Sequence, residues 1–187
     1  MIYIKDNFLP DIILNSIEKY LIDFKEVDTG EKKFWIMDTP KEFEEWIVNR
    51  ISKIENKEIK NIFSFFRIST DILDIDWRIH CDSIIQGEIP ERAIVLYLSD
   101  SPDKKLNGTA FWEHEEYGES LPSEYLSTDV YNNLIRNDAN DLSKWQLKSV
   151  VGLNKNRLLS YPSNYFHSKY PNQSWEEGRK VFVMFYK

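Results

Sequence analysis

The sequence contains only three histidines, and two of them stand two positions before an acidic residue. These pairs are His80 with Asp82, in WRIHCDSII, and His114 with Glu116, in AFWEHEEYG. We predict a strand at residues 77–85, and side chains two positions apart on a strand share one face, about 6.6–6.8 Å apart. An imidazole and a carboxylate at that spacing can reach one metal ion, so His80 and Asp82 are candidate metal ligands. The alternative is a hydrogen-bonded polar pair on a sheet face.

The third histidine, His167, could complete such a site. It follows a predicted strand at residues 157–163 and precedes a turn. Two imidazoles and one carboxylate form the facial ligand set of non-haem Fe(II) oxygenases, which leaves the other coordination positions open. For His114 and Glu116 we predict instead a place at a strand end or rim without a metal, because they lead into an acidic segment.

Arg179 opens the last apolar run of the chain, shortly after His167. The strand–turn–strand pattern predicts that the two segments are antiparallel neighbours about 4.8 Å apart, with both side chains facing one cavity. A buried guanidinium needs an anion, and it binds a carboxylate through two N–H groups. A dicarboxylic co-substrate with its other end on the metal would supply that anion. The alternative is a structural pairing with Glu176 or Glu177.

The elements that position these residues divide the chain into a helical first part and a β-rich remainder. Residues 9–24 and 38–58 have apolar side chains at helical spacing, and Thr39 with Glu42 predicts a capping box on the second helix. From about residue 61 the period becomes that of strands. The β-type runs lie at residues 61–69, 77–85, 92–100, 107–115, 147–153, 157–163 and 180–187.

This order of elements predicts a mainly β fold with N-terminal helices (α+β), a double-stranded β-helix or jelly roll with the helices packed on one sheet. We expect one domain over residues 1–187, with helical support in residues 1–60 and the jelly-roll core in residues 61–187. Residues 116–147 interrupt the strands, and we predict a short helix after Ser127 or Thr128. This insertion is interpreted either as a surface excursion or as a lid over the site.

Composition limits the classes of function. Hydrophobic residues make up 42% of the chain, enough for a sizeable core, and the formal net charge of −7 argues against a nucleic-acid partner. No apolar run approaches the length of a membrane span, and the first residues lack the pattern of a signal peptide. One cysteine, Cys81, excludes an internal disulfide. We therefore expect a soluble cytoplasmic protein without a membrane partner.

These residues together resemble the 2-oxoglutarate/Fe(II)-dependent oxygenase superfamily. The resemblance rests on His80-x-Asp82, then His167, then Arg179 before a terminal apolar strand. Within the superfamily the chain is most similar to the prolyl-4-hydroxylase-like branch, through the segments IYIKDNFLP, RAIVLYLSD and NGTAFW. In the second segment, Tyr97 matches a tyrosine that often meets the far carboxylate of 2-oxoglutarate.

The resemblance implies a dioxygenase that uses Fe(II), 2-oxoglutarate and O2. His80, Asp82 and His167 would bind the iron, and Arg179 with Tyr97 would anchor 2-oxoglutarate. The implied reaction hydroxylates a C–H bond of a protein side chain or small molecule, and it forms succinate and CO2.

Two other functions are compatible with the residues. A cupin-like metalloenzyme that does not use 2-oxoglutarate would have no need of Arg179. A catalytically inactive binding module on the same fold would have no need of an intact ligand set. The branch that demethylates nucleic acids carries a second arginine where this chain has Phe185, which argues against a nucleic-acid substrate.

Overall fold

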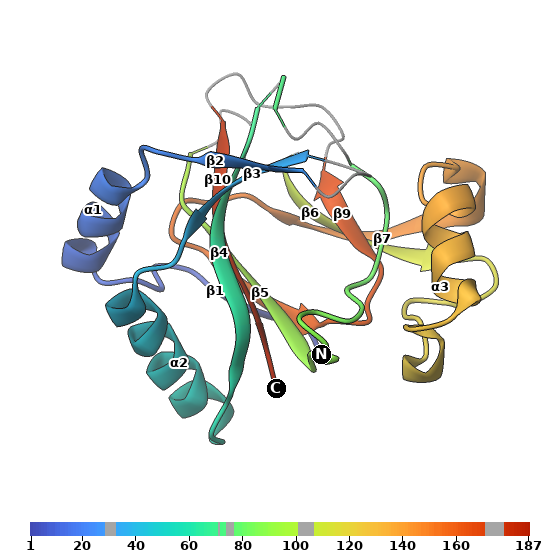
Figure 1. Ribbon diagram of the computed structural model, residues 1–187, viewed down its shortest axis with the longest axis horizontal. Coiled ribbons are helices and arrows are strands. Elements are labelled where there is room, and N and C mark those ends of the chain that lie inside the picture. Colours follow the sequence, from blue (N-terminus) through green and yellow to red (C-terminus); the bar gives the residue numbers. More distant parts are fainter. Residues whose placement is uncertain (29–32, 71, 74–76, 101–106, 171–177) are drawn as a thin grey trace.

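Two antiparallel sheets face each other in the computed structural model, which describes residues 1–28, 33–70, 72–73, 77–100, 107–170 and 178–187 (Figure 1). Within these residues the larger sheet has seven strands in the order β1-β8-β5-β10-β4-β3-β2. In that order their bounds are Tyr3–Lys5, Leu158–Pro162, Arg92–Tyr97, Arg179–Tyr186, Asn61–Ser69, Lys33–Asp38 and Lys25–Asp28. The smaller sheet has the order β7-β6-β9. Its bounds are Trp145–Gly152, Gly108–His114 and His167–Tyr170.

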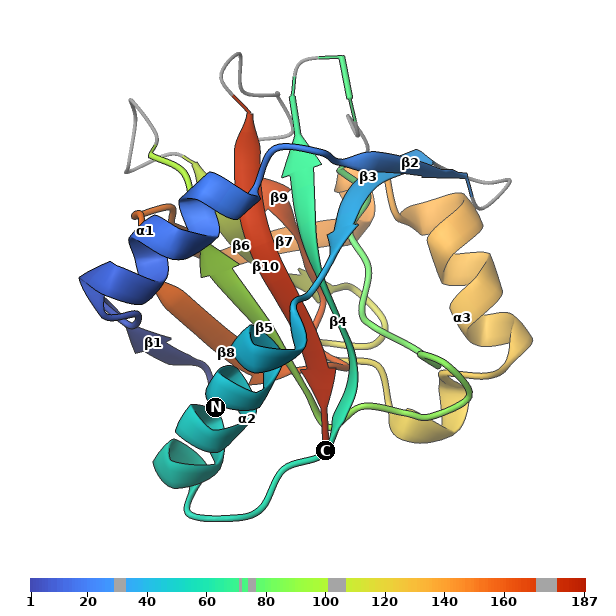
Figure 2. The ribbon, with the colours of Figure 1, turned by 60° about the vertical axis from the view of Figure 1, so that its left-hand side comes forward.

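Helices α1 (Asp11–Tyr20) and α2 (Lys41–Glu55) lie against one face of the larger sheet (Figure 2). Their apolar stripes form one buried cluster with the strand residues beneath them, which includes Ile17, Ile47 and Phe182. No side chain caps the first turn of α2, so the predicted capping box is wrong. The helix begins directly after Pro40, whose ring presets the backbone for a helical start.

Strand β10 is apolar on both faces because both faces are buried. Phe182 and Met184 belong to the cluster under the helices, whereas Val181 and Val183 belong to a second cluster between the two sheets. Side chains alternate along a strand, so an inner strand covered on both faces has apolar residues at nearly every position. The inner faces of the two sheets enclose the site described below.

Four short strands were not predicted from the sequence, and one predicted strand is absent. Strands β1, β2 and β3 lie in the part of the chain that was expected to be helical, and β9 begins at His167. Residues 77–85 are described but form no strand, and their only pairings are isolated bridges at His80 and Ile85. The remaining β-type runs correspond to β4, β5, β6, β7, β8 and β10.

The insertion between β6 and β7 packs on the outer face of the smaller sheet. It contains α3 (Asp129–Asn133), whose first turn is capped by the hydroxyl of Thr128, which accepts a hydrogen bond from the amide of Val130 at 3.3 Å. Two short 3-10 turns (Ser123–Tyr125 and Leu142–Lys144) and a π-helical turn (Leu134–Asp138) complete it. Among the described residues, none of the helices is both long and apolar enough to cross a membrane.

Candidate metal centre

His80, Asp82 and His167 come together at one end of the space between the sheets. Their ligand atoms all lie within 4.8 Å of one another. His167 is the first residue of β9, and the other two lie on the irregular segment of residues 77–85. Asp82 and His167 are 9% and 7% exposed, so a charge brought here is largely shielded from water.

Backbone hydrogen bonds hold the segment of residues 77–85 in place without a strand. The amide of His80 donates to the carbonyl of His167 at 3.0 Å, and the amide of His167 donates back at 2.7 Å. The amide of Asp82 donates to the carbonyl of Ser163 at 2.8 Å. The two histidines are therefore fixed directly opposite each other, and their ring centroids are 4.5 Å apart.

The hydrogen bonds of the two imidazoles define which nitrogen faces the site. Nδ1 of His80 donates to the carbonyl of Arg78, and Nδ1 of His167 donates to the carbonyl of Tyr165, each at 2.8 Å. In the neutral ring this leaves a lone pair on each Nε2, which is the state a metal ligand needs. Nε2 of His167 lies 3.9 Å from Oδ1 of Asp82, beyond hydrogen-bond length. Three electron-pair donors thus converge, and two imidazoles with one carboxylate fit Fe(II).

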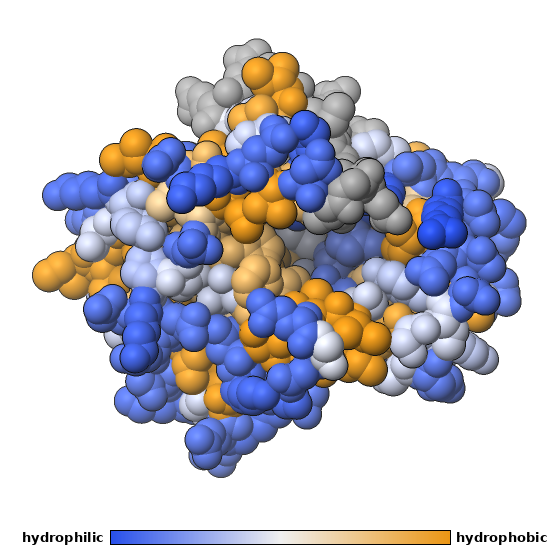
Figure 3. All heavy atoms as spheres, in the orientation of Figure 1, coloured by the Kyte–Doolittle hydropathy of each residue, from blue (hydrophilic) through white to orange (hydrophobic). Residues whose placement is uncertain are grey.

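The three candidate ligands border a cavity of about 510 Å³ between the two sheets. Figure 3 shows a hollow near the centre of this face of the molecule, with hydrophobic side chains on its borders. Apolar residues of the larger sheet form much of the lining, among them Phe63, Phe65, Val183 and Phe185. The volume is within the range of small-molecule sites.

Arg179 lines the same cavity from β10 and is 4% exposed. The sequence predicted that the strand of Arg179 pairs with the strand of His167, and this prediction is wrong. β10 lies between β5 and β4 in the larger sheet, and β9 pairs with β6 in the smaller one. The two side chains share the cavity because their sheets face each other. Glu176 and Glu177, the structural partners considered for Arg179, lie outside the described residues.

Tyr97 lies beneath Arg179 and does not itself border the cavity. The guanidinium carbon of Arg179 is 5.4 Å from the centroid of the Tyr97 ring. The Tyr97 hydroxyl is hydrogen-bonded to the hydroxyl of Thr109 at 2.7 Å. Burial raises the pKa of Tyr97, and the positive charge of Arg179 opposes that rise. Tyr97 is therefore a neutral phenol that supports the guanidinium.

His114 is the last residue of β6, at the predicted strand end, but it is buried rather than on the rim, and it is not part of this cluster. It is 2% exposed, and its Nε2 lies 3.4 Å from Oδ2 of Asp138 in the insertion. Its Nδ1 accepts a hydrogen bond from the amide of Glu116 at 3.2 Å. The ring also contacts Trp145 at a centroid distance of 4.6 Å. His114 thus anchors the insertion to the end of β6.

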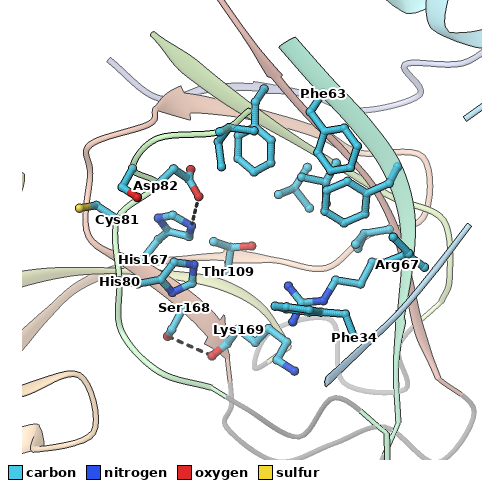
Figure 4. Close-up of a pocket in the computed structure, with 18 of the residues that line it drawn as sticks. Phe34, Phe63, Arg67, His80, Cys81, Asp82, Thr109, His167, Ser168 and Lys169 are labelled. Carbon is cyan, nitrogen blue, oxygen red and sulfur yellow. Dashed lines mark hydrogen bonds and ion pairs between the residues drawn. The ribbon is translucent and has the colours of Figure 1, made fainter. Parts of the chain in front are cut away.

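Several polar residues of the cavity were not identified from the sequence, and Arg67, Lys169 and Tyr131 are among them. Arg67 and Lys169 line it from β4 and β9, and Tyr131 reaches it from α3. Arg67 shares one face of β4 with Phe63 and Phe65, and Lys169 shares one face of β9 with His167, so strand periodicity could have placed both. No sequence pattern links Tyr131 to the site. Figure 4 shows Arg67, Phe34 and Phe63 across the cavity from His80 and His167.

Comparisons with known proteins rest on structure, since no protein-family model and no curated protein matches the sequence. HygX from Streptomyces hygroscopicus, crystallised with nickel, 2-oxoglutarate and hygromycin B bound, has a TM-score of 0.63 at 13% identity, over 99% of this chain and 82% of HygX. A prolyl-4-hydroxylase from Pseudomonas putida has a TM-score of 0.56 at 10% identity, over 100% of this chain and 91% of its own.

A third similar structure is the non-haem α-ketoglutarate-dependent carbocyclase SnoK from nogalamycin biosynthesis. It has a TM-score of 0.62 at 11% identity, over 99% of this chain and 78% of SnoK. At identities this low, the structural similarity shows a common fold and nothing more specific. The chain therefore has the fold of the 2-oxoglutarate-dependent enzymes that its sequence resembles, a prolyl-4-hydroxylase among them.

Proposed function

We propose that this chain is an Fe(II)- and 2-oxoglutarate-dependent dioxygenase that hydroxylates a C–H bond of a small molecule or protein side chain. One observation carries the proposal. Two histidines and an aspartate converge on one point, and a buried arginine lines the same cavity. The shared fold with 2-oxoglutarate-dependent enzymes supports it.

Each residue of the site has a defined task. His80, Asp82 and His167 would hold Fe(II) through Nε2, a carboxylate oxygen and Nε2. When bound, Fe(II) together with 2-oxoglutarate and O2 supplies the oxidation of a C–H bond, with succinate and CO2 as co-products. Arg179 would pair with the far carboxylate of 2-oxoglutarate, and the Tyr97 ring would keep the guanidinium aimed at it. We propose that this reaction takes place in a reducing cytoplasm, where Cys81, the single cysteine, remains a thiol.

The apolar lining contributes by excluding water. Tyr161 contacts the His167 ring at a centroid distance of 4.7 Å, and burial raises the pKa of Tyr161 well above its usual range. This phenol therefore stays neutral beside the ligands and adds no competing anion. Low-dielectric apolar walls strengthen the attraction between Arg179 and a carboxylate, because they screen the charges less than bulk water does.

The test is an anaerobic titration of Fe(II) and then 2-oxoglutarate into the metal-free protein, followed by the visible metal-to-ligand charge-transfer band. We expect the band in the wild type, no band in His80→Ala, and a much higher 2-oxoglutarate requirement in Arg179→Ala. The control is Arg50→Ala, which removes an exposed arginine on α2 and should behave like the wild type.

The other functions predict different results. A folded protein that binds iron without developing the band would be a metalloenzyme that does not use 2-oxoglutarate. A folded protein that binds no metal would be a binding module. Either result would overturn the proposed function.

A further inference from the structure

Tyr161 of β8 is a buried tyrosine whose hydroxyl has no partner among the described residues. Its side chain lines the cavity and is 3% exposed, and no described residue forms a hydrogen bond with its hydroxyl. The hydroxyls of two other buried tyrosines are paired, that of Tyr97 with Thr109 and that of Tyr186 with Glu55. A buried hydroxyl without a partner has given up its hydrogen bonds to water, so it requires an explanation.

The Tyr161 hydroxyl can be reached from the cavity. It is not sealed off by the described residues around it. The ring is held between two neighbours, with centroid distances of 5.2 Å to Phe111 and 4.7 Å to His167. These contacts fix the direction in which the hydroxyl points. A phenol can donate and accept a hydrogen bond, so a polar group of a molecule in the cavity can pair with it.

The register of the larger sheet places Tyr161 away from Arg179. Ala93 of β5 pairs with Tyr161 on one side and with Phe185 of β10 on the other, and Phe185 pairs with Phe63 of β4. These residues form one row across the sheet, which we call the Tyr161 row. Arg179 begins β10 six residues before Phe185, about 20 Å along the strand. A 2-oxoglutarate molecule directed from the metal to Arg179 would therefore extend away from the Tyr161 row, which leaves this row for the substrate.

The wall on either side of the Tyr161 hydroxyl is apolar. The next row of the sheet consists of Leu159, Val95, Val183 and Phe65. Phe65 lies 5.2 Å from Phe63 and 6.5 Å from Phe185 between ring centroids. Figure 4 shows Phe63 across the cavity from the three candidate ligands. Within these two rows, Tyr161 supplies the only polar side chain, so a molecule held here meets apolar surface and one hydroxyl.

On the basis of the proposed function, we propose that the substrate is a largely apolar small molecule with one uncharged hydrogen-bond acceptor, and that Tyr161 selects it. The Tyr161 O–H donates to this acceptor, a ketone or alcohol oxygen. The apolar body packs on Phe63, Phe65 and Phe185, and one of its C–H bonds faces the candidate ligands. A hydrocarbon of the same shape would leave the hydroxyl unpaired and would lose that part of the affinity.

Proton NMR titrations on protein saturated with Ni(II) and 2-oxoglutarate test this assignment. The probes are the ketones acetophenone and cyclohexanone. Each is compared with the hydrocarbon in which a methylene group replaces the carbonyl oxygen, α-methylstyrene and methylenecyclohexane. Paramagnetic Ni(II) broadens the lines of a probe that binds near the candidate ligands, so the titration reports both affinity and location. We expect at least one ketone to bind beside the metal.

Tyr161→Phe removes the hydroxyl and keeps the ring. For the ketone that binds, its affinity relative to that of its hydrocarbon should fall about fivefold in this variant, as expected for one hydrogen bond between uncharged groups. Both proteins are titrated with the same probes, so differences in probe solubility cancel. The control is Tyr20→Phe, the same change at an exposed tyrosine of α1, which should leave the relative affinity unchanged. Equal relative affinities in wild type and Tyr161→Phe, or no probe bound near the metal, overturn the inference.

Urea denaturation of the ligand-free variant gives an independent readout and shows that the variant folds. Tyr97→Phe removes a paired hydroxyl, whereas Tyr161→Phe removes one that no described residue pairs. Tyr161→Phe should therefore unfold at the same urea concentration as the wild type or at a higher one, and Tyr97→Phe at a lower one. A lower midpoint for Tyr161→Phe would show that the hydroxyl stabilises the protein itself, which overturns the inference.

The same experiments separate this inference from the proposed function. If Ni(II) and 2-oxoglutarate bind but the preference for ketones does not depend on Tyr161, only the substrate inference fails. If Tyr161→Phe raises the dissociation constant of 2-oxoglutarate about fivefold or more, the hydroxyl serves the co-substrate and the inference also fails. If Ni(II) or 2-oxoglutarate does not bind, the proposed function fails. Titration of the unloaded protein, followed by the chemical shifts of the probes, still decides whether Tyr161 selects ketones.

Discussion

The proposed function gives Tyr97 and Arg179 different tasks in holding the carboxylate of 2-oxoglutarate. The resemblance implies that both contact 2-oxoglutarate, but in the structure the Tyr97 hydroxyl is hydrogen-bonded to Thr109 and the ring lies under the guanidinium. Tyr97 is 0% exposed and Arg179 borders the cavity. In the proposed function, Arg179 would therefore be the contact with 2-oxoglutarate, and Tyr97 would act through it.

Replacing Tyr97 with phenylalanine separates these two tasks. The change leaves the buried Thr109 hydroxyl without this partner, so the free energy of unfolding should fall by about 1 kcal/mol in urea denaturation. The dissociation constant of 2-oxoglutarate, measured with Ni(II) bound, should change by less than about threefold. Arg179→Met should raise that constant by about tenfold or more, because it removes a charged partner. Equal losses in the two variants would show that the Tyr97 hydroxyl, and not only its ring, is needed to hold the co-substrate.

Residue spacing identified the three ligand candidates, although the expected local structure was wrong. His80 and Asp82 were placed together by strand alternation, yet residues 77–85 form no strand. The structure brings them to His167 through reciprocal backbone bonds between His80 and His167. Such pairing depends on partners far away in the sequence, which a local pattern does not contain.

At the scale of elements, the insertion holds the segment that carries two of the three candidate metal ligands. The amide of Ile79 donates to the carbonyl of Ala139 at 2.9 Å, and the Tyr131 hydroxyl donates to the carbonyl of Cys81 at 3.3 Å. Ile79 and Cys81 also share a buried cluster with Leu134 of the insertion. The insertion thus supports the segment of residues 77–85 on the side away from β9, where a sheet would have a neighbouring strand.

Leu134→Ala tests this support. Loss of a buried leucine should lower the free energy of unfolding by about 2–5 kcal/mol, and the ligand segment should become less well ordered. We expect Ni(II) affinity, measured by calorimetry at a temperature where the variant is folded, to fall by about tenfold. The matched control is Ile47→Ala in α2, which is equally buried but packs on the other face of the larger sheet. A similar loss of metal affinity in both variants would mean that only global stability is involved.

Elements with a strong local pattern were predictable, and those that depend on distant partners were not. β4 was predicted at residues 61–69 and lies at Asn61–Ser69. β1 has three residues and pairs with β8 from the other end of the chain. β9 has four residues, too few for a pattern of alternation to be distinguished from a turn. The insertion's helix was predictable because Thr128 caps it locally.

At the scale of the whole molecule, the site connects the two sheets. His167 belongs to the smaller sheet, and Arg179 belongs to the larger one. A metal bound by His80, Asp82 and His167 would tie the irregular ligand segment to β9. A 2-oxoglutarate molecule that joins this metal to Arg179 would then tie the smaller sheet to the larger one. A ligand that binds only the folded state stabilises it by RT ln(1 + [L]/Kd), so the stabilisation grows with the logarithm of the ligand concentration above the dissociation constant.

Loading should therefore stabilise the protein in two separate steps. Ni(II) at about one hundred times its dissociation constant should add about 2.7 kcal/mol to the free energy of unfolding, and 2-oxoglutarate at the same excess should add a similar amount. His80→Ala should lose both increments, because 2-oxoglutarate needs the metal at one end. Arg179→Met should keep the increment from Ni(II) and lose most of the increment from 2-oxoglutarate. Urea denaturation with and without each ligand measures both increments in the wild type and in each variant, with Arg50→Gln as the unchanged control. If 2-oxoglutarate stabilises His80→Ala as strongly as the wild type, it binds without the metal and does not join the two sheets through this site.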